Sequence, residues 1–270
     1  MNVIVFGAHP DDCELQAGGT AIRFVESGHK VKFVSVTNGD AGHQTEGGGA
    51  LAKRRRAEAA KADKILGVES VVLDNHDAEL LPTLKIREQL IRLIRDWNAD
   101  IVIAPRPNDY HPDHRYTGVL VQDTAYMVIV PNVCPDTPPL KKNPVYMFLQ
   151  DRFQSPEPFR PDVIVPIDNV IEQKSCALNV MISQFYEWLP WTSGNLENVP
   201  EGNSERRAWL GKNMRRRSTN RYVKETQAMY GHARAKSIGL IEAFQVCEYG
   251  RRPSREELRK LFPFLPVFAS

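Results

Sequence analysis

The chain of 270 residues lacks several features that would assign its class at once. No stretch approaches the roughly 18 consecutive apolar residues of a membrane-spanning helix, so we expect no membrane span. The net charge is only +2, which provides no bulk electrostatic attraction to nucleic acid. The first residues lack the basic region, apolar stretch and cleavage site of a secretory signal, and this predicts a cytoplasmic protein.

The cysteine and glycine patterns disfavour two further kinds of site. The cysteines show no C-x-x-C spacing, which is typical of reduced thiols in a cytoplasmic protein; they are Cys13, Cys134, Cys176 and Cys247. The first apolar segment is followed by Gly7-x-His9, whereas a dinucleotide-binding turn needs the pattern G-x-G-x-x-G. A disulfide framework and a pyrophosphate-binding loop are therefore both poor interpretations.

The apolar share of 42% and the charged share of 25% are those of an ordinary soluble globular protein. Apolar strands alternate with helical segments, which predicts an α/β fold whose mostly parallel sheet has helices on both faces. The expected strands are 3–6, 31–37, 70–73, 101–104, 146–149 and 162–167. The expected helices are 15–26, 50–66, 83–97, 117–127, 170–187 and 204–230.

The C-terminal part is expected to be less regular. Segment 131–144 carries five prolines and is predicted to be a loop or lid, and segment 189–203 a second mobile loop. Segment 238–246 is expected to return to the domain. Residues 1–250 are predicted to form a single domain, followed by a tail, 251–270, with a short helix at 254–261.

Two clusters of histidine and aspartate follow expected strands. His9-Pro10-Asp11-Asp12 comes after the first strand, and His111-Pro112-Asp113-His114 comes after the strand at 101–104. Asn38-Gly39-Asp40 follows a third strand. Ligands of parallel sheets bind beyond the carboxyl ends of the strands. These three segments are therefore expected to converge on one site.

The side chains of the two clusters suit a divalent metal ion. His9, Asp12 and His114 would supply two imidazoles and one carboxylate, a set that suits Zn²⁺ or Fe²⁺ and leaves positions for water and substrate. Such an ion lowers the pKa of bound water and polarises a carbonyl. Asp11 is then a candidate general base.

The remaining cluster residues would complete a hydrolytic site. A protonated His111 could stabilise an oxyanion and protonate a leaving amine, and Asp113 could hold His111 or tune its pKa. The alternative is that each cluster is only a turn, in which Asp11 or Asp12 caps the following helix. The presence of two such clusters at two strand ends favours the metal site.

The motif pair Ala8-His9-Pro10-Asp11-Asp12-x-Glu14 and His111-Pro112-Asp113-His114 resembles the PIG-L / LmbE-like family of metal-dependent de-N-acetylases. The resemblance extends over roughly residues 1–185. It implies a Rossmann-like α/β domain, a zinc-type hydrolase and a small amino-sugar conjugate as substrate. It also implies a homo-oligomer, because family members are often trimers or hexamers.

The resemblance assigns roles residue by residue. The implied metal ligands are His9, Asp12 and His114, the general base is Asp11, and the general acid or oxyanion stabiliser is His111, with Asp113 behind it. Two further positions are similar to family substrate contacts. Arg55 would meet the substrate's other substituent, and Asp77 would accept hydrogen bonds from sugar hydroxyls. The plainer alternatives are a solvated basic helix face for Arg55 and a loop turn for Asp77.

The sequence departs from the family pattern at Met181, where a histidine is usual. Four aromatic residues, which could stack on a sugar or pack in the core, are Tyr186, Trp188, Trp191 and Trp209. The basic runs 53–56 and 215–217 are not interleaved with aromatics, which indicates solvated helix faces rather than nucleic-acid binding.

The first functional hypothesis is a metal-dependent hydrolase that removes an N-acetyl group from an N-acetylglucosamine-containing compound. The alternatives are a metal-dependent amidase or esterase with a non-sugar substrate, and a non-catalytic metal-binding protein.

Overall fold

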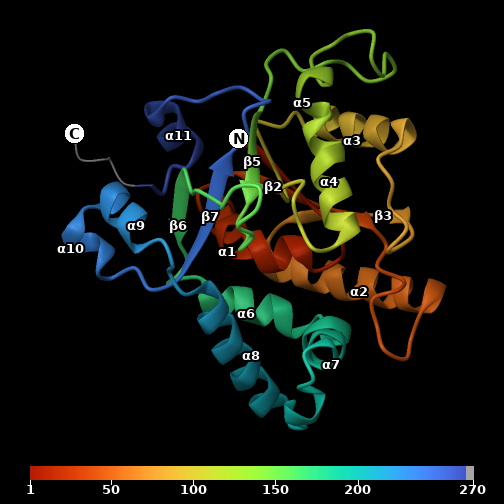
Figure 1. Cartoon of the computed structure of the whole chain (residues 1–270), viewed down its shortest axis with the longest axis vertical. Helices are drawn as coiled ribbons and strands as arrows, with labels where there is room; N and C mark the ends of the chain where they lie inside the picture. Colours follow the sequence, from red (N-terminus) through yellow and green to blue (C-terminus); the bar gives the residue numbers. More distant parts are fainter. Residues whose placement is uncertain (266–270) are drawn as a thin grey trace.

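Seven strands form one sheet in the computed structural model, which describes residues 1–265 (Figure 1). Their bounds are Asn2–Gly7 (β1), Lys30–Thr37 (β2), Glu69–Asn75 (β3), Ile101–Ala104 (β4), Val145–Leu149 (β5), Val163–Pro166 (β6) and Ile241–Val246 (β7). The strand order is β3-β2-β1-β4-β5-β7-β6. The first five strands are parallel, whereas β7 runs antiparallel to both β5 and β6. The expected mostly parallel sheet is confirmed.

The described helices surround this sheet. They are Asp12–Glu26 (α1), Gly48–Leu66 (α2), Leu84–Asp96 (α3), Pro112–Gln122 (α4), Thr124–Met127 (α5), Ile171–Asn179 (α6), Leu189–Thr192 (α7), Asn203–Ser218 (α8), Val223–Tyr230 (α9), His232–Ala235 (α10) and Arg255–Leu261 (α11). A π-helix, Ser183–Trp188 (η1), and a 3-10 helix, Leu196–Asn198 (η2), complete them. In this part of the chain, no helix is both long and apolar enough to cross a membrane.

The two faces of the sheet bury separate cores because side chains alternate along each strand. Val3 and Val5 of β1 face a core shared with α1, α2, α6 and α8. Ile4 and Phe6 face the opposite core, which is completed by α3, α4 and α5. Both faces are therefore covered by helices, as the continuous apolar strands predict.

Several element bounds differ from expectation. Helix α4 begins at Pro112 rather than 117, because His111 caps it and proline fits its first turn. The expected helix 204–230 is interrupted where Thr219 pairs with Leu240 and the Asn220 N–H donates to Gly239. The expected loop 189–203 contains the two short helices α7 and η2.

The predicted tail packs onto the domain. Ser254 caps the short helix α11 by accepting the Glu257 N–H, as its sequence indicates. Phe262 is fully buried against Phe24 and Phe244 in the core of the α1 face. The last part of the predicted tail, 266–270, lies outside the described residues.

Two buried carboxyl groups meet between α1 and α2. Glu14 and Asp63 are both buried, and burial raises the pKa of each carboxyl. The charge of Asp63 raises the pKa of Glu14 further. A carboxyl with a raised pKa is tolerated in the fold while it is protonated, and the stability it contributes falls as pH rises through that pKa.

Asp63→Asn is therefore expected to raise the melting temperature relative to wild type more at pH 8 than at pH 5. A gain on the order of 2–4 °C at pH 8 corresponds to roughly 1 kcal/mol. Thermal unfolding of both proteins at the two pH values measures the effect. An equal change at both pH values would contradict the charged-pair explanation.

Candidate active site

The site lies where the strand order reverses. Strands β2 and β3 extend from one side of β1, and β4 and β5 extend from the other. Such a switch point leaves a crevice beyond the carboxyl ends of the two central strands. The turn after β1 and the loop after β4 bring together the two His/Asp clusters, so the predicted convergence of these clusters is observed.

His9, Asp12 and His114 form a nearly equilateral triangle of ligand atoms. His9 Nδ1 lies 3.5 Å from Asp12 Oδ2 and 3.3 Å from His114 Nε2, and the last two atoms are 3.4 Å apart. Tetrahedral coordination with bonds of roughly 2.0–2.1 Å has ligand-to-ligand distances of about 3.3 Å. The three atoms therefore have the spacing that a zinc-type ion requires.

Asp12 is fixed by the backbone of its own turn. Its Oδ2 accepts the Ala8 and His9 N–H groups at 2.9 and 2.8 Å. Asp11, at the N-cap position of α1, makes no side-chain capping bond. These contacts do not support the alternative in which the aspartates only cap the helix.

The electrostatics of the cluster also suit a cation. Burial lowers the pKa of His9, but Asp113, Asp12 and Asp77 outweigh this effect and raise it well above its usual range. Burial alone would raise the pKa of Asp12, whereas His114 and His9 hold it well below its usual range. The surrounding carboxylates thus stabilise positive charge at the centre of the triangle, and the donor set fits a divalent metal ion.

His9 is oriented from its far side. Its Nε2 lies 3.0 Å from Asp77 Oδ1 and 3.3 Å from Asp113 Oδ2. A carboxylate on the second nitrogen of a ligating histidine fixes the ring and its tautomer. Two other sets of side chains are also close enough to hold a metal, His9 with His111 and His114, and His9 with Asp77 and Asp113. We favour the triangle because Asp77 and Asp113 already contact His9 Nε2, and because His111 Nδ1 already accepts the Asp113 N–H.

Asp113 differs in its contacts from the expectation. Its fully buried carboxylate accepts the Ala78 N–H at 2.7 Å and contacts His9, not His111. Its backbone N–H donates to His111 Nδ1 at 3.2 Å. Because Nδ1 is an acceptor, a neutral His111 carries its proton on Nε2. Burial, and then the charges of His9 and His114, lower the pKa of His111.

Arg55 was expected to contact the substrate, but its closest contact is with Asp11, the predicted general base. The guanidinium is buried, with Nη2 3.0 Å from Asp11 Oδ1 and Nη1 3.7 Å from Asp77 Oδ2. Burial raises the pKa of Asp11, and the charge of Arg55 opposes this rise. Gly39 has φ +71°, and a Cβ there would lie 2.5 Å from Arg55 Nη1, so this turn needs glycine.

Asp109 is a site residue that the sequence reasoning missed. Its Oδ1 lies 3.1 Å from His114 Nδ1 and accepts the His111 N–H at 3.0 Å. It therefore supports His114 as Asp77 and Asp113 support His9. The sequence feature that could have identified Asp109 is its position two residues before the second His/Asp cluster.

A cavity of about 850 Å³ opens over these residues. Arg55 and Asp77 line it, although their closest contacts are to Asp11 and His9. The four aromatic residues that could stack on a sugar form two separate pairs. Trp188 lines the cavity and stacks on Trp191, with centroids 5.2 Å apart, whereas Tyr186 is buried beside Trp209.

Met181 is buried in the core, where a thioether packs well. The neighbouring residue Gln184 reaches the cavity and donates to the Gly42 carbonyl at 3.1 Å. The departure from the family pattern at Met181 therefore removes no side chain from the cavity lining.

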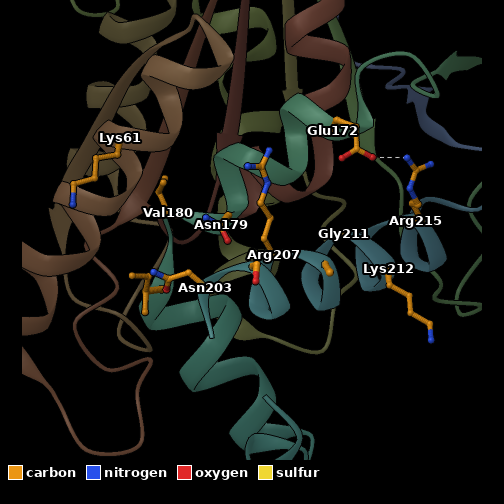
Figure 2. A pocket seen from close by; sticks show the side chains of 12 residues that line it. Lys61, Glu172, Asn179, Val180, Asn203, Arg207, Gly211, Lys212 and Arg215 are labelled. Atoms are coloured by element: carbon orange, nitrogen blue, oxygen red, sulfur yellow. Dashed lines mark hydrogen bonds and ion pairs between the residues drawn. The ribbon is translucent and has the colours of Figure 1, made fainter. Parts of the chain in front are cut away.

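A second hollow, of about 1130 Å³, is an open groove beside α6 and α8 (Figure 2). Its lining includes Lys61, Glu172, Arg207, Lys212 and Arg215, and it contains no histidine or aspartate. The lining of this groove therefore offers no set of histidine and aspartate ligands like that of His9, Asp12 and His114.

Comparison with known proteins identifies the family of the chain. Residues 4–125 match the PIG-L family, described as GlcNAc-PI de-N-acetylase. The chain is 32% identical over 202 residues to a diacetylchitobiose deacetylase of Thermococcus kodakarensis, an alignment that covers 70% of this chain and 73% of the relative. The family match and this relative define the chain as a de-N-acetylase, an enzyme that cleaves a carbon–nitrogen bond. The chain belongs to the PIG-L / LmbE-like family, as its two motifs indicate.

Solved structures extend the likeness over most of the chain. An N,N'-diacetylchitobiose deacetylase from Pyrococcus horikoshii is 25% identical, with a TM-score of 0.69 over 94% of this chain and 88% of that one. The 4-carboxy-2-hydroxymuconate hydratase of Pseudomonas putida is 21% identical, with a TM-score of 0.74 over 94% and 98%. At that identity the second likeness shows the fold alone.

Proposed function

We propose that the protein is a metal-dependent hydrolase that removes the N-acetyl group from an N-acetylglucosamine-containing sugar or conjugate. The observation that carries the proposal is the triangle of His9, Asp12 and His114 beside the Asp11 carboxylate in one cavity. The relative from Thermococcus, named as a diacetylchitobiose deacetylase, supports the sugar substrate. The donor set suits Zn²⁺, with Fe²⁺ as the second choice.

Each residue of the cavity has a proposed part in the reaction. His9, Asp12 and His114 would hold a zinc-type ion, which when bound would supply water of lowered pKa and polarise a carbonyl. Asp11, oriented by Arg55, accepts the proton of the attacking water, for which its raised pKa suits it. His111 presents Nε2–H, which donates a hydrogen bond to the developing oxyanion. Asp11 then passes the proton it took from water to the leaving amine.

In this proposal Arg55 and Asp77 are positioning residues that act through other residues of the site. Arg55 orients the base, and Asp77 orients His9, while both still face the cavity where a sugar would bind. We also propose a cytoplasmic homo-oligomer, a trimer or hexamer, in agreement with the family resemblance. Light scattering of the purified protein measures the assembly directly.

Acetate release tests the proposed activity. Metal-loaded protein is assayed with N-acetylglucosamine conjugates, including diacetylchitobiose, and in parallel with N-acetyl amino acids and acetyl esters. Hydrolysis confined to the amino sugars is the expected result. Preference for the non-sugar substrates would favour a general amidase or esterase, and no hydrolysis by fully loaded protein would favour a non-catalytic role.

A further inference from the structure

Four arginines line the active-site cavity, and only two of them pair with a carboxylate. The four are Arg55, Arg106, Arg152 and Arg217. Arg55 and Arg106 each pair with an aspartate, with closest contacts of 3.0 and 2.5 Å. The guanidinium groups of Arg152 and Arg217 make no hydrogen bond or ion pair with any other of residues 1–265. The cavity wall therefore carries two cations that no side chain among residues 1–265 pairs with.

The two cations come from distant parts of the sequence. Arg152 lies in the loop after β5, and Arg217 lies in the last turn of α8. Successive residues of an α-helix point about 100° apart, so the basic run 215–217 cannot face one way. Arg215 turns to the second groove and pairs with Glu172 (Figure 2), while Arg217 turns to the active site.

Arg217 lines the same cavity as Asp11 and Asp12 and is influenced by their charges. Arg217 is exposed at the rim of the cavity, where desolvation and the charge of Arg152 lower its pKa, while the charges of Asp11 and Asp12 oppose this effect. Arg152 is also exposed, and desolvation and the charges of Arg221 and Arg216 lower its pKa. Cations gathered in this way repel one another, and an anion bound between them would relieve the repulsion.

We propose that Arg152 and Arg217 form a subsite for an anionic group, a carboxylate or a phosphate, carried by the substrate away from its acetamide. Guanidinium groups bind both anions through paired N–H donors, which supports this assignment. The inference rests on the proposed function and makes it more specific, because it selects charged over neutral amino sugars. It also separates Arg217 from Arg215, which lies on the same helix turn but faces away.

Binding of product-like amines tests the subsite without turnover. Metal-loaded protein is titrated by calorimetry with glucosamine 1-phosphate, glucosamine 6-phosphate, muramic acid and methyl glucosaminide, which has the same amine but no anionic group. At least one of the anion-bearing amines is expected to bind about 10- to 100-fold more tightly than methyl glucosaminide. The phosphate and carboxylate compounds show which anion the subsite takes. Equal affinity for all four compounds would overturn the proposal.

The double variant R152Q/R217Q is expected to lose this preference, and each single variant part of it. The matched control, R215Q, removes the same charge from the same helix and is expected to retain the preference. Melting temperatures show whether the double variant is folded. A folded double variant that still prefers the anion would also overturn the proposal.

Turnover separates this inference from the proposed function. With the N-acetylated forms of the same compounds, the double variant is expected to raise KM for the anionic substrate more than it lowers kcat. If no acetamide is cleaved but anion-selective binding persists, the subsite stands and the proposed function fails. If acetamides are cleaved with one KM for charged and neutral substrates, the subsite fails and the proposed function stands.

Discussion

Asp11→Asn is expected to reduce turnover by about 10²- to 10⁴-fold while fold and metal content are retained. Asparagine keeps the shape of the side chain but cannot accept a proton from water. Asp11 makes no capping bond and lies 3.0 Å from Arg55, so its carboxylate has a partner that orients it without blocking its second oxygen. Steady-state rates with an N-acetylglucosamine conjugate measure the effect.

The matched control for this change is Asp136→Asn. Asp136 is a surface aspartate paired with Arg92, outside the cavity, and its loss is expected to leave the rate unchanged. Circular dichroism and elemental analysis show whether the Asp11 variant keeps its fold and metal. Full activity in a folded, loaded Asp11 variant would exclude this residue as the base.

His9→Ala is expected to abolish both bound metal and turnover, the second large effect. The change removes one corner of the triangle, whose remaining ligand atoms, on Asp12 and His114, are 3.4 Å apart. It also removes the imidazole that the buried carboxylates of Asp77 and Asp113 both contact. Metal content of the purified protein, with zinc and iron measured separately, is the primary readout.

His232→Ala is the control for the loss of a histidine as such. His232 lies on α10, is exposed and is not part of the cavity lining. Its metal content and rate are expected to match wild type. Unchanged metal content in the His9 variant would count against the proposed ligand set, whichever rate accompanies it.

Much of the sheet could be predicted because apolar strands and intervening helices are local features. The bounds that could not be predicted depend on distant partners. Thr219 leaves the helical path to pair with Leu240, and the side chain of His111, at the end of a loop, starts α4 early. Neither contact can be predicted from the local helix propensity of the sequence.

The sequence predicted which residues come together in the site, but it did not predict which partner each of them contacts. The position of His9, Asp12 and His114 follows from strand ends in a parallel sheet. Whether Arg55 faces substrate or Asp11, and whether Asp113 holds His111 or His9, depends on side-chain directions that spacing does not fix. Arg217 was hidden for a similar reason, because a basic run gives no sign of which member faces the cavity.

The position of β7 has a consequence for how the protein is made. Strands β5 and β6 pair with β7 and not with each other, so β6 has no hydrogen-bonded neighbour until residues 241–246 are available. During synthesis, β5 must then wait with an open edge while about 90 further residues are added, and open edges promote aggregation. The segment that completes the sheet also delivers Glu242, which accepts the Gly19 and Thr20 N–H groups of α1 at 2.9 and 2.6 Å. The first helix of the chain therefore reaches its final contacts only when one of the last strands arrives, which makes this a fold of high contact order that is expected to form slowly.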